Sequence, residues 1–237
     1  MHGEKHDAKT LKPSTNPARK EKEGAVWQVD NNKAWRNMIA YWILGALVGN
    51  QINCFPTKVF STDRNFPIFA IVSAGLVTAS CQAILLPRFG SFGRRRSWLA
   101  VVVFALFNGS CETCLFLASY DAGKGVAARV GSNAWFVKLV GYSAYSVYSA
   151  LVHAKFWLPF VFPRHILPTA PLFATTALPA LMAMSLAWLW LYEHSSHEAV
   201  GVIMLQHAFV DAVFAARICL PPPAGLSWRC EPSQLLT

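Results

Sequence analysis

Four ionisable side chains lie within long apolar stretches of this 237-residue sequence: Glu112, His153, His207 and Asp211. Burying such a group in hydrocarbon costs of the order of 3 kcal/mol on insertion scales, and the groups retained there usually face a bundle interior and serve a function. These four residues are therefore the first candidates for chemistry.

The spacing of these residues suggests how they could act together. His207 and Asp211 are four positions apart, so on a helix they project from one face, and a carboxylate beside an imidazole fixes its tautomer and raises its basicity. Asn108 lies one helical turn before Glu112, where it could hydrogen-bond Glu112 or serve as an oxyanion donor. Together these side chains suit the activation of a water molecule for attack on an amide or ester carbonyl.

The residue types leave other interpretations open. Two imidazoles and a carboxylate are also a common ligand set for a catalytic zinc ion, although no metal or other cofactor is assigned at this point. Each His or Glu could instead bridge two helices through a single hydrogen bond. Cys111 and Cys114 form a C-x-x-C in apolar sequence without a second pair, and they are interpreted as packing residues.

The elements that must position these residues are predicted to be transmembrane helices. The chain is 54% hydrophobic and 14% charged, which is too apolar for an ordinary soluble domain. A membrane-spanning helix needs about 20 apolar residues. We predict an all-α membrane bundle of about six spans, at 35–55, 66–86, 97–119, 134–162, 170–192 and 199–220, with a glycine-rich loop at 121–133.

The charge distribution predicts the topology. Residues 1–33 read as a disordered basic tail, 34–220 as the helix bundle and 221–237 as a short C-terminal tail. With the N-terminus in the cytoplasm, 15 Lys and Arg fall on the inner side and four on the outer side, as the positive-inside rule requires. Both termini are therefore expected inside. The net charge of +9 is explained by topology and predicts no nucleic-acid partner.

The order Glu, His, His-x-x-x-Asp over the last four apolar segments resembles the CPBP family of intramembrane proteins, which includes the type II CAAX prenyl endopeptidases. That family has a Glu-Glu pair followed by Arg, then Phe-x-x-x-His, then His followed four positions later by Asn or Asp. These motifs correspond to Asn108–Phe116, to Ser149–His153, and to His207 with Asp211. The similar arrangement covers about residues 66–220.

This chain departs from the family pattern at three positions. Cys111 stands where one of the paired Glu residues would be, Phe116 or Leu117 occupies the Arg position, and Ser149 replaces the Phe. The resemblance implies that a glutamate-activated water hydrolyses a peptide bond within the membrane. In that mechanism Glu112 is the base, and the histidines stabilise the oxyanion and orient the water. The departures also allow a member that has changed substrate, or that binds without cutting.

The sequence thus predicts a multi-pass intramembrane hydrolase whose surroundings are the lipid bilayer and whose substrate is a membrane protein or a lipid-like molecule. One alternative is a non-enzymatic membrane protein that binds a pigment, lipid or metal, or that supports the assembly of a complex. His153 near Phe156 and Trp157 would suit a ring-shaped ligand. A metal-dependent lipid hydrolase is the third interpretation.

Overall fold

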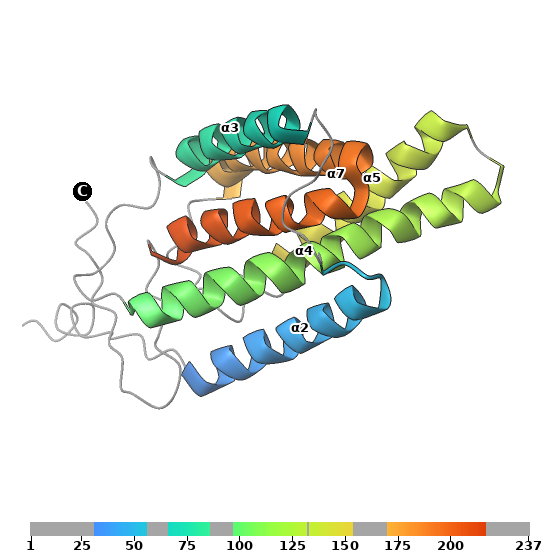
Figure 1. The fold of residues 1–237 in the computed structure, drawn as a ribbon. Coiled ribbons are helices and arrows are strands. Elements are labelled where there is room, and N and C mark those ends of the chain that lie inside the picture. The colour runs from blue at the N-terminus through green and yellow to red at the C-terminus, as the bar shows by residue number, and fades with distance from the viewer. Residues whose placement is uncertain (1–30, 56–65, 86–96, 132, 154–169, 217–237) are drawn as a thin grey trace, which may run out of the picture.

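The computed structural model describes residues 31–55, 66–85, 97–131, 133–153 and 170–216, and these residues form helices without any strand. The helices are α2 (Asn31–Gln51), α3 (Phe66–Leu85), α4 (Trp98–Arg129), α5 (Ala134–Leu151) and α7 (Ala170–Ala215) (Figure 1). The all-helical fold class is confirmed. Most of the predicted N-terminal tail, the C-terminal tail, and Phe156 and Trp157 lie outside the described residues.

Local signals in the sequence explain where several helices begin and end. The side chains of Ser97 and Asn133 cap the first turns of α4 and α5 by accepting hydrogen bonds from the backbone N–H groups of Ala100 and Phe136. Gly131 follows α4 with a φ of 71°, a left-handed conformation in which glycine ends helices without steric cost. Pro67 occupies the first turn of α3, where its missing N–H has no helical partner.

Helix α7 reverses direction near its middle. The indole N–H of Trp188 donates to Gln206 at 3.0 Å, and the ring centroids of Trp188 and His207 are 4.9 Å apart. A straight helix would separate residues 18 positions apart by about 27 Å. The two arms of α7 therefore lie side by side and antiparallel, on either side of the polar insert at 193–198 (Figure 1).

The predicted loop at 121–133 is wrong, because α4 continues through it to Arg129. Glycine weakens an isolated helix, but here Gly123 allows α5 to approach closely. A Cβ at Gly123 would lie 2.8 Å from the Cβ of Ala144 and 2.9 Å from the carbonyl oxygen of Val140. Packing against α5 thus outweighs the low helix propensity of the glycines.

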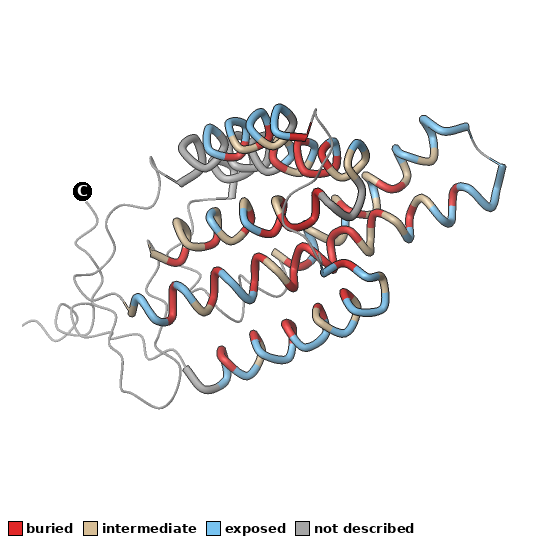
Figure 2. Tube along the Cα trace, in the orientation of Figure 1, coloured by how far each residue is buried: buried red, intermediate tan, exposed pale blue. Residues whose placement is uncertain are grey.

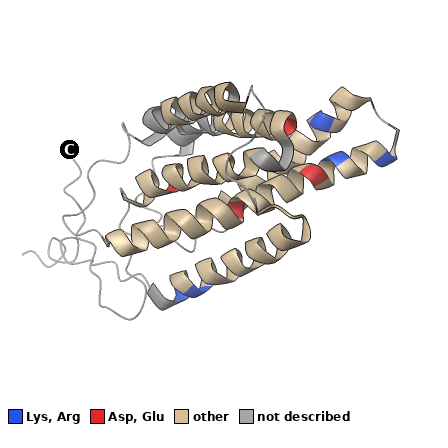
Figure 3. Cartoon of the chain, viewed as in Figure 1, with Lys and Arg blue, Asp and Glu red and all other residues tan. Residues whose placement is uncertain are grey.

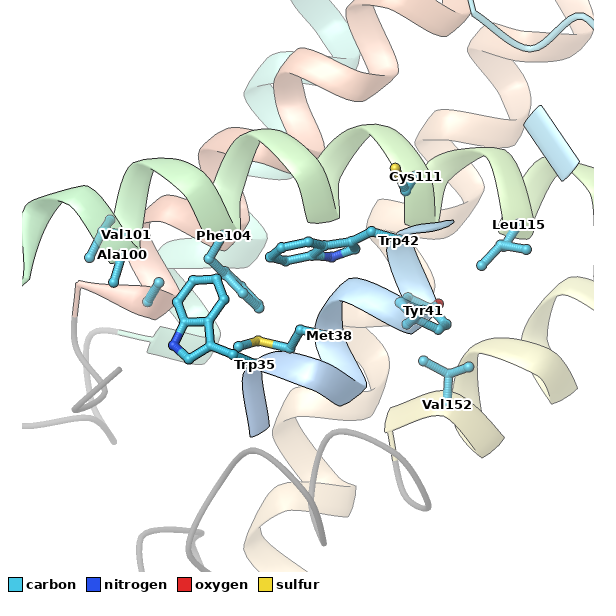
Figure 4. Close-up of a cluster of buried hydrophobic side chains, with 11 residues drawn as sticks. Trp35, Met38, Tyr41, Trp42, Ala100, Val101, Phe104, Cys111, Leu115 and Val152 are labelled. Carbon is cyan, nitrogen blue, oxygen red and sulfur yellow. The ribbon is translucent and has the colours of Figure 1, made fainter. Parts of the chain in front are cut away.

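The helices alternate in direction along the bundle (Figure 1). Helix α4 is central and packs against α2, α5 and α7, while α3 packs against α7. The start of α2 and the end of α7 lie at the same end of the bundle (Figure 1). In the cluster between α2 and α4, Trp42 lies against Phe104, with their ring centroids 6.3 Å apart (Figure 4).

Apolar side chains cover much of the outside of the bundle as well as its core, and a few polar side chains are fully buried. Apolar side chains such as Ile71 of α3, Leu47 of α2 and Leu99 of α4 are exposed, whereas Asn108 and Glu112 are each 1% exposed. In Figure 2 exposed residues follow one face of α2 and of α3, whereas the middle of α4 is buried. In Figure 3 the basic residues of the described helices lie at the ends of the bundle.

Helix α4 is the one described helix that is long and apolar enough, by length and composition, to cross a membrane by itself. Shorter apolar stretches occupy 66–79 and 199–215. Where the described parts of the other predicted spans can be compared, each contains a helix: α2, α3, α5 and the two arms of α7.

Candidate functional site

The fold brings Glu112 of α4 together with His207 and Asp211 of α7 in the interior of the bundle. Oε2 of Glu112 lies 3.5 Å from Nε2 of His207, and Oδ2 of Asp211 lies 3.7 Å from the same nitrogen. One ligand atom from each residue lies within 4.8 Å of the other two. We call these three residues the carboxylate–imidazole cluster; each is at least nine-tenths buried.

Asn108 ties the two carboxylates together. Its Nδ2 amino group donates to Oε2 of Glu112 at 2.7 Å and to Oδ2 of Asp211 at 3.0 Å. The indole N–H of Trp42 donates to Oδ1 of Asn108 at 3.1 Å, and because an indole can only donate, this contact fixes which end of the amide faces the carboxylates. The contact expected between Asn108 and Glu112 is therefore present. Because both amino hydrogens are engaged, Asn108 positions the carboxylates rather than offering a free oxyanion donor.

The tautomer of His207 follows from its contact with Thr113. The Thr113 hydroxyl donates to the carbonyl oxygen of Gly109 at 2.6 Å, so its oxygen accepts a hydrogen bond from Nδ1–H of His207 at 3.0 Å. In the neutral imidazole, Nε2 therefore carries the lone pair. This lone pair belongs to the nitrogen that faces Glu112 and Asp211.

Helix α2 closes the other side of the cluster. The hydroxyl of Tyr41 donates to Oε1 of Glu112 at 3.0 Å and lies 3.4 Å from the hydroxyl of Tyr148 on α5. Glu112 thus receives hydrogen bonds on both of its oxygens. Tyr41, Trp42 and Thr113 were not predicted from the sequence, because hydroxyl and indole groups in apolar segments look like ordinary packing or interface residues.

Close helix contacts create this geometry. A Cβ at Gly109 would lie 2.5 Å from the backbone nitrogen of Ala208, so α4 and α7 meet at backbone distance one residue after His207. A Cβ at Gly45 would similarly lie 2.6 Å from the carbonyl oxygen of Cys111. Gly45 and Gly49 form a G-x-x-x-G in α2, and a Cβ at Gly49 would lie 2.7 Å from Sγ of Cys114, so these small residues let α2 approach α4.

His153, the fourth predicted residue, lies outside the carboxylate–imidazole cluster. Its Nδ1 is 2.7 Å from the carbonyl oxygen of Ser149 and therefore carries the proton, which leaves Nε2 as an acceptor in the neutral ring. The Phe116 ring contacts both histidines: its centroid is 6.2 Å from that of His153 and 5.8 Å from that of His207, and it stacks on the His207 ring. Among the contacts of the described residues, none joins His153 directly to the cluster.

A second group of charges lies where α4, α5 and the reversal of α7 meet. Glu193 accepts hydrogen bonds from Lys124 at 2.7 Å and Tyr120 at 2.9 Å, and it pairs with Lys138 at 2.9 Å. We call Glu193, Lys124 and Lys138 the lysine–glutamate network. Partial burial alone would raise the pKa of Glu193, but its three partners outweigh burial and lower that pKa to about 2. Because these ion pairs join α4, α5 and α7, we interpret the lysine–glutamate network as structural.

No protein-family model matches this chain, and neither the curated proteins nor the solved structures contain a significant match to it. The carboxylate–imidazole cluster offers a proton acceptor, a second base beside it, and three atoms able to bind a cation. Two of its members lie on one helix and the third on another, so tertiary packing assembles it.

Proposed function

We propose that this chain is a multi-pass membrane protein that hydrolyses an amide or ester bond of a membrane-embedded substrate. The observation that carries the proposal is the approach of Glu112 Oε2 to within 3.5 Å of His207 Nε2 inside the bundle. At that separation both atoms can contact one water molecule. A carboxylate and an imidazole that share a water form the minimum arrangement for general-base activation.

The exposed apolar surface supports the membrane location. Large apolar side chains cover the outer faces of several helices: Ile39, Ile43, Leu44 and Leu47 of α2, Ile68, Ile71, Val72 and Leu76 of α3, and Leu99, Val102, Leu106 and Phe107 of α4. Exposed apolar patches of this extent are unusual in soluble monomers and mark contact with lipid or a partner. Lipid contact explains them together with the buried polar cluster.

Six spans with both ends in the cytoplasm fit the arrangement of the helices. The two arms of α7 count as two spans and, with α2 to α5, make six antiparallel segments. The alternating helix directions favour an even number of crossings (Figure 1). The excess of Lys and Arg on the predicted inner side supports the orientation.

In the proposed reaction, the water oxygen attacks the substrate carbonyl carbon while Glu112 accepts the water proton. Collapse of the tetrahedral intermediate breaks the bond to the leaving group, and the same proton is returned to that group through Glu112 or His207. Asp211 and Asn108 hold these two side chains in position. His153, whose ring contacts Phe116, would supply a further polar group near the oxyanion.

The order of the site residues, which resembles the CPBP family, supports a peptide bond in a lipid-modified or membrane-spanning segment as the substrate. An ester of a lipid would suit the same cluster. The first assay therefore pairs a fluorogenic farnesylated peptide with a long-chain 4-methylumbelliferyl ester, both in detergent micelles.

The test is the substitution Glu112→Gln, which keeps the shape of the side chain but removes its basicity. Turnover of the hydrolysed probe should fall by about 100-fold or more, since a positioned base contributes 10²- to 10⁴-fold. Glu193→Gln is the matched control, because Glu193 lies in the lysine–glutamate network, and its turnover should be kept. Unchanged turnover in Glu112→Gln would remove Glu112 from this role.

A non-enzymatic ligand site is the second candidate, favoured by the aromatic rings that contact His207. Phe116 stacks on the His207 ring and Trp188 lies 4.9 Å from it, centroid to centroid. Such surroundings suit a ring-shaped pigment or a lipid. If neither probe is hydrolysed, the absorption spectrum and lipid content of the purified protein would identify a retained ligand.

A further inference from the structure

The geometry points to a divalent transition-metal site in the carboxylate–imidazole cluster, with Glu112 Oε2, His207 Nε2 and Asp211 Oδ2 as its three protein ligands. This inference rests on the proposed function, since it names the cofactor of the same site. One imidazole with two carboxylates suits zinc, iron or manganese, and zinc is the first ion to test.

The distances within the cluster favour an intervening ion over a direct ion pair. A charge-assisted hydrogen bond from an imidazolium to a carboxylate is typically 2.7–2.9 Å long. The two contacts of His207 Nε2 measure 3.5 Å and 3.7 Å. Ligand atoms placed tetrahedrally about 2.0–2.1 Å from zinc lie about 3.3 Å from one another. The two distances from His207 Nε2 to the carboxylate oxygens are thus close to the distance between neighbouring ligand atoms around a zinc ion.

The tautomer of His207 is the one that a ligand needs. A ligating histidine donates its other ring N–H to an acceptor, which fixes the ring and directs the lone pair at the metal. Here Nδ1–H donates to Thr113, whose own proton is engaged by the carbonyl oxygen of Gly109. The lone pair of the neutral ring therefore lies on Nε2, which is the ring nitrogen nearest the two carboxylates.

The carboxylates also have the outer partners expected of ligands. The amino group of Asn108 donates to both ligating oxygens, and Tyr41 donates to the other oxygen of Glu112. Such contacts orient ligating carboxylates, and their loss typically lowers metal affinity 10- to 100-fold. An oxygen that accepts from Asn108 keeps lone-pair density for a cation.

The two acidic members of the cluster are buried and suit a cation. Glu112 and Asp211 are 1% and 8% exposed, and His207 is the one member of the cluster able to carry a positive charge. Two buried carboxylates attract a divalent cation more strongly in a low-dielectric interior than they would in water. A divalent ion with a neutral imidazole makes the cluster neutral.

A bound ion of this class would polarise a substrate carbonyl and acidify a coordinated water. With an ion bound, Glu112 would be one of its three ligands, and the role of base given to Glu112 above would apply to the metal-free site. Three protein ligands leave an open position for water or substrate, which is the arrangement of catalytic rather than structural zinc sites.

The experiment measures the metal content of tag-free, detergent-purified protein after removal of metal and incubation with Zn²⁺. We expect about one zinc per chain by mass spectrometry, at least a ten-fold loss in Glu112→Gln, His207→Ala and Asp211→Asn, and full retention in His153→Ala and His194→Ala. His194 is the matched control because it is an exposed histidine of α7.

A second readout avoids variants that fail to fold. The metal-free wild-type protein is titrated with Co²⁺, and we expect saturable visible ligand-field bands that Zn²⁺ removes. No bands and no retained zinc would overturn the metal site, as would zinc retained in all three ligand variants.

The two proposals can fail separately. Hydrolysis that continues after complete chelation of metal would show that the reaction needs no metal, and the proposed function would stand. Zinc binding by a protein that hydrolyses neither probe would support the metal site and contradict the proposed hydrolase.

Discussion

Glu112 is fully buried and Glu193 is partly buried, and the surroundings of the two carboxylates differ in kind. Glu193 is held by the ammonium groups of Lys124 and Lys138 at the end of α4 and the start of α5. Glu112 lies at the centre of α4, where its hydrogen bonds come from the neutral groups of Asn108 and Tyr41, with Asp211 held by the same amide. One carboxylate has its charge balanced by basic residues, and the other shares its surroundings with a second carboxylate.

This difference separates a structural role from a functional one. A balanced ion cluster near the surface stabilises the fold modestly and needs no further partner. Two carboxylates beside one imidazole in an apolar interior are retained at a cost in stability. Such a cost in stability is typical of ligand-binding and catalytic sites. Substitutions in the two clusters should therefore differ in their effects on hydrolysis and on stability.

The largest effect is expected from separating α4 from α7 with Gly109→Val. Because even a Cβ there would lie 2.5 Å from the Ala208 nitrogen, the helices must move apart and the carboxylate–imidazole cluster must open. We expect loss of hydrolysis and a fall of about 1–3 kcal/mol or more in the free energy of unfolding, measured by denaturation in detergent.

The matched control for this change is Gly125→Ala, on the same helix. A Cβ at Gly125 has no neighbour within 4 Å, so alanine should keep activity and stabilise α4 by about 0.5–1 kcal/mol. Equal losses in the two variants would show that helix propensity, and not the contact with α7, governs the effect of Gly109.

A smaller but sharper effect is expected from a double-mutant cycle of His207→Ala and Asp211→Asn. Asn108 donates hydrogen bonds to both Asp211 and Glu112. Because His207 and Asp211 belong to the same carboxylate–imidazole cluster, we expect them to act as one unit. Each single change should lower kcat/KM by about 100-fold and the double change by little more, since residues that act together are not additive. Additive losses measured by steady-state kinetics would contradict a single cluster.

The smallest effect is expected from Glu193→Gln in the lysine–glutamate network. The pKa of Glu193 lies at about 2, below its ordinary value of 4.5, so its ion pairs stabilise the fold above pH 4.5 and are lost as the pH falls towards 2. Glutamine should cost about 1–2 kcal/mol at pH 7, after allowance for solvent screening, and leave hydrolysis intact.

The pH dependence of unfolding tests the same point. The stability difference between wild type and Glu193→Gln should be largest near neutral pH and shrink between pH 4.5 and 3. A difference that grows on acidification would show that the Glu193 carboxylate is not paired in the folded protein.

The sequence alone determined most of the helices. Their apolar lengths and the caps at Ser97 and Asn133 depend on neighbouring residues, and such short-range signals are legible in a single chain. The predicted spans at 66–86 and 134–162 thus begin where α3 and α5 begin. The spacing of four residues also placed Asn108 with Glu112, and His207 with Asp211, on shared helix faces.

Tertiary structure alone decided how these pairs meet. The contact of Glu112 with His207 depends on Gly109 meeting Ala208, and the Tyr41 hydrogen bond depends on the close approach of α2 to α4. Packing against α5 also extended α4 through its glycines, where local propensity predicted a loop. Contacts between segments far apart in sequence are set by the complementarity of whole helix faces, and no local pattern records which faces will pair.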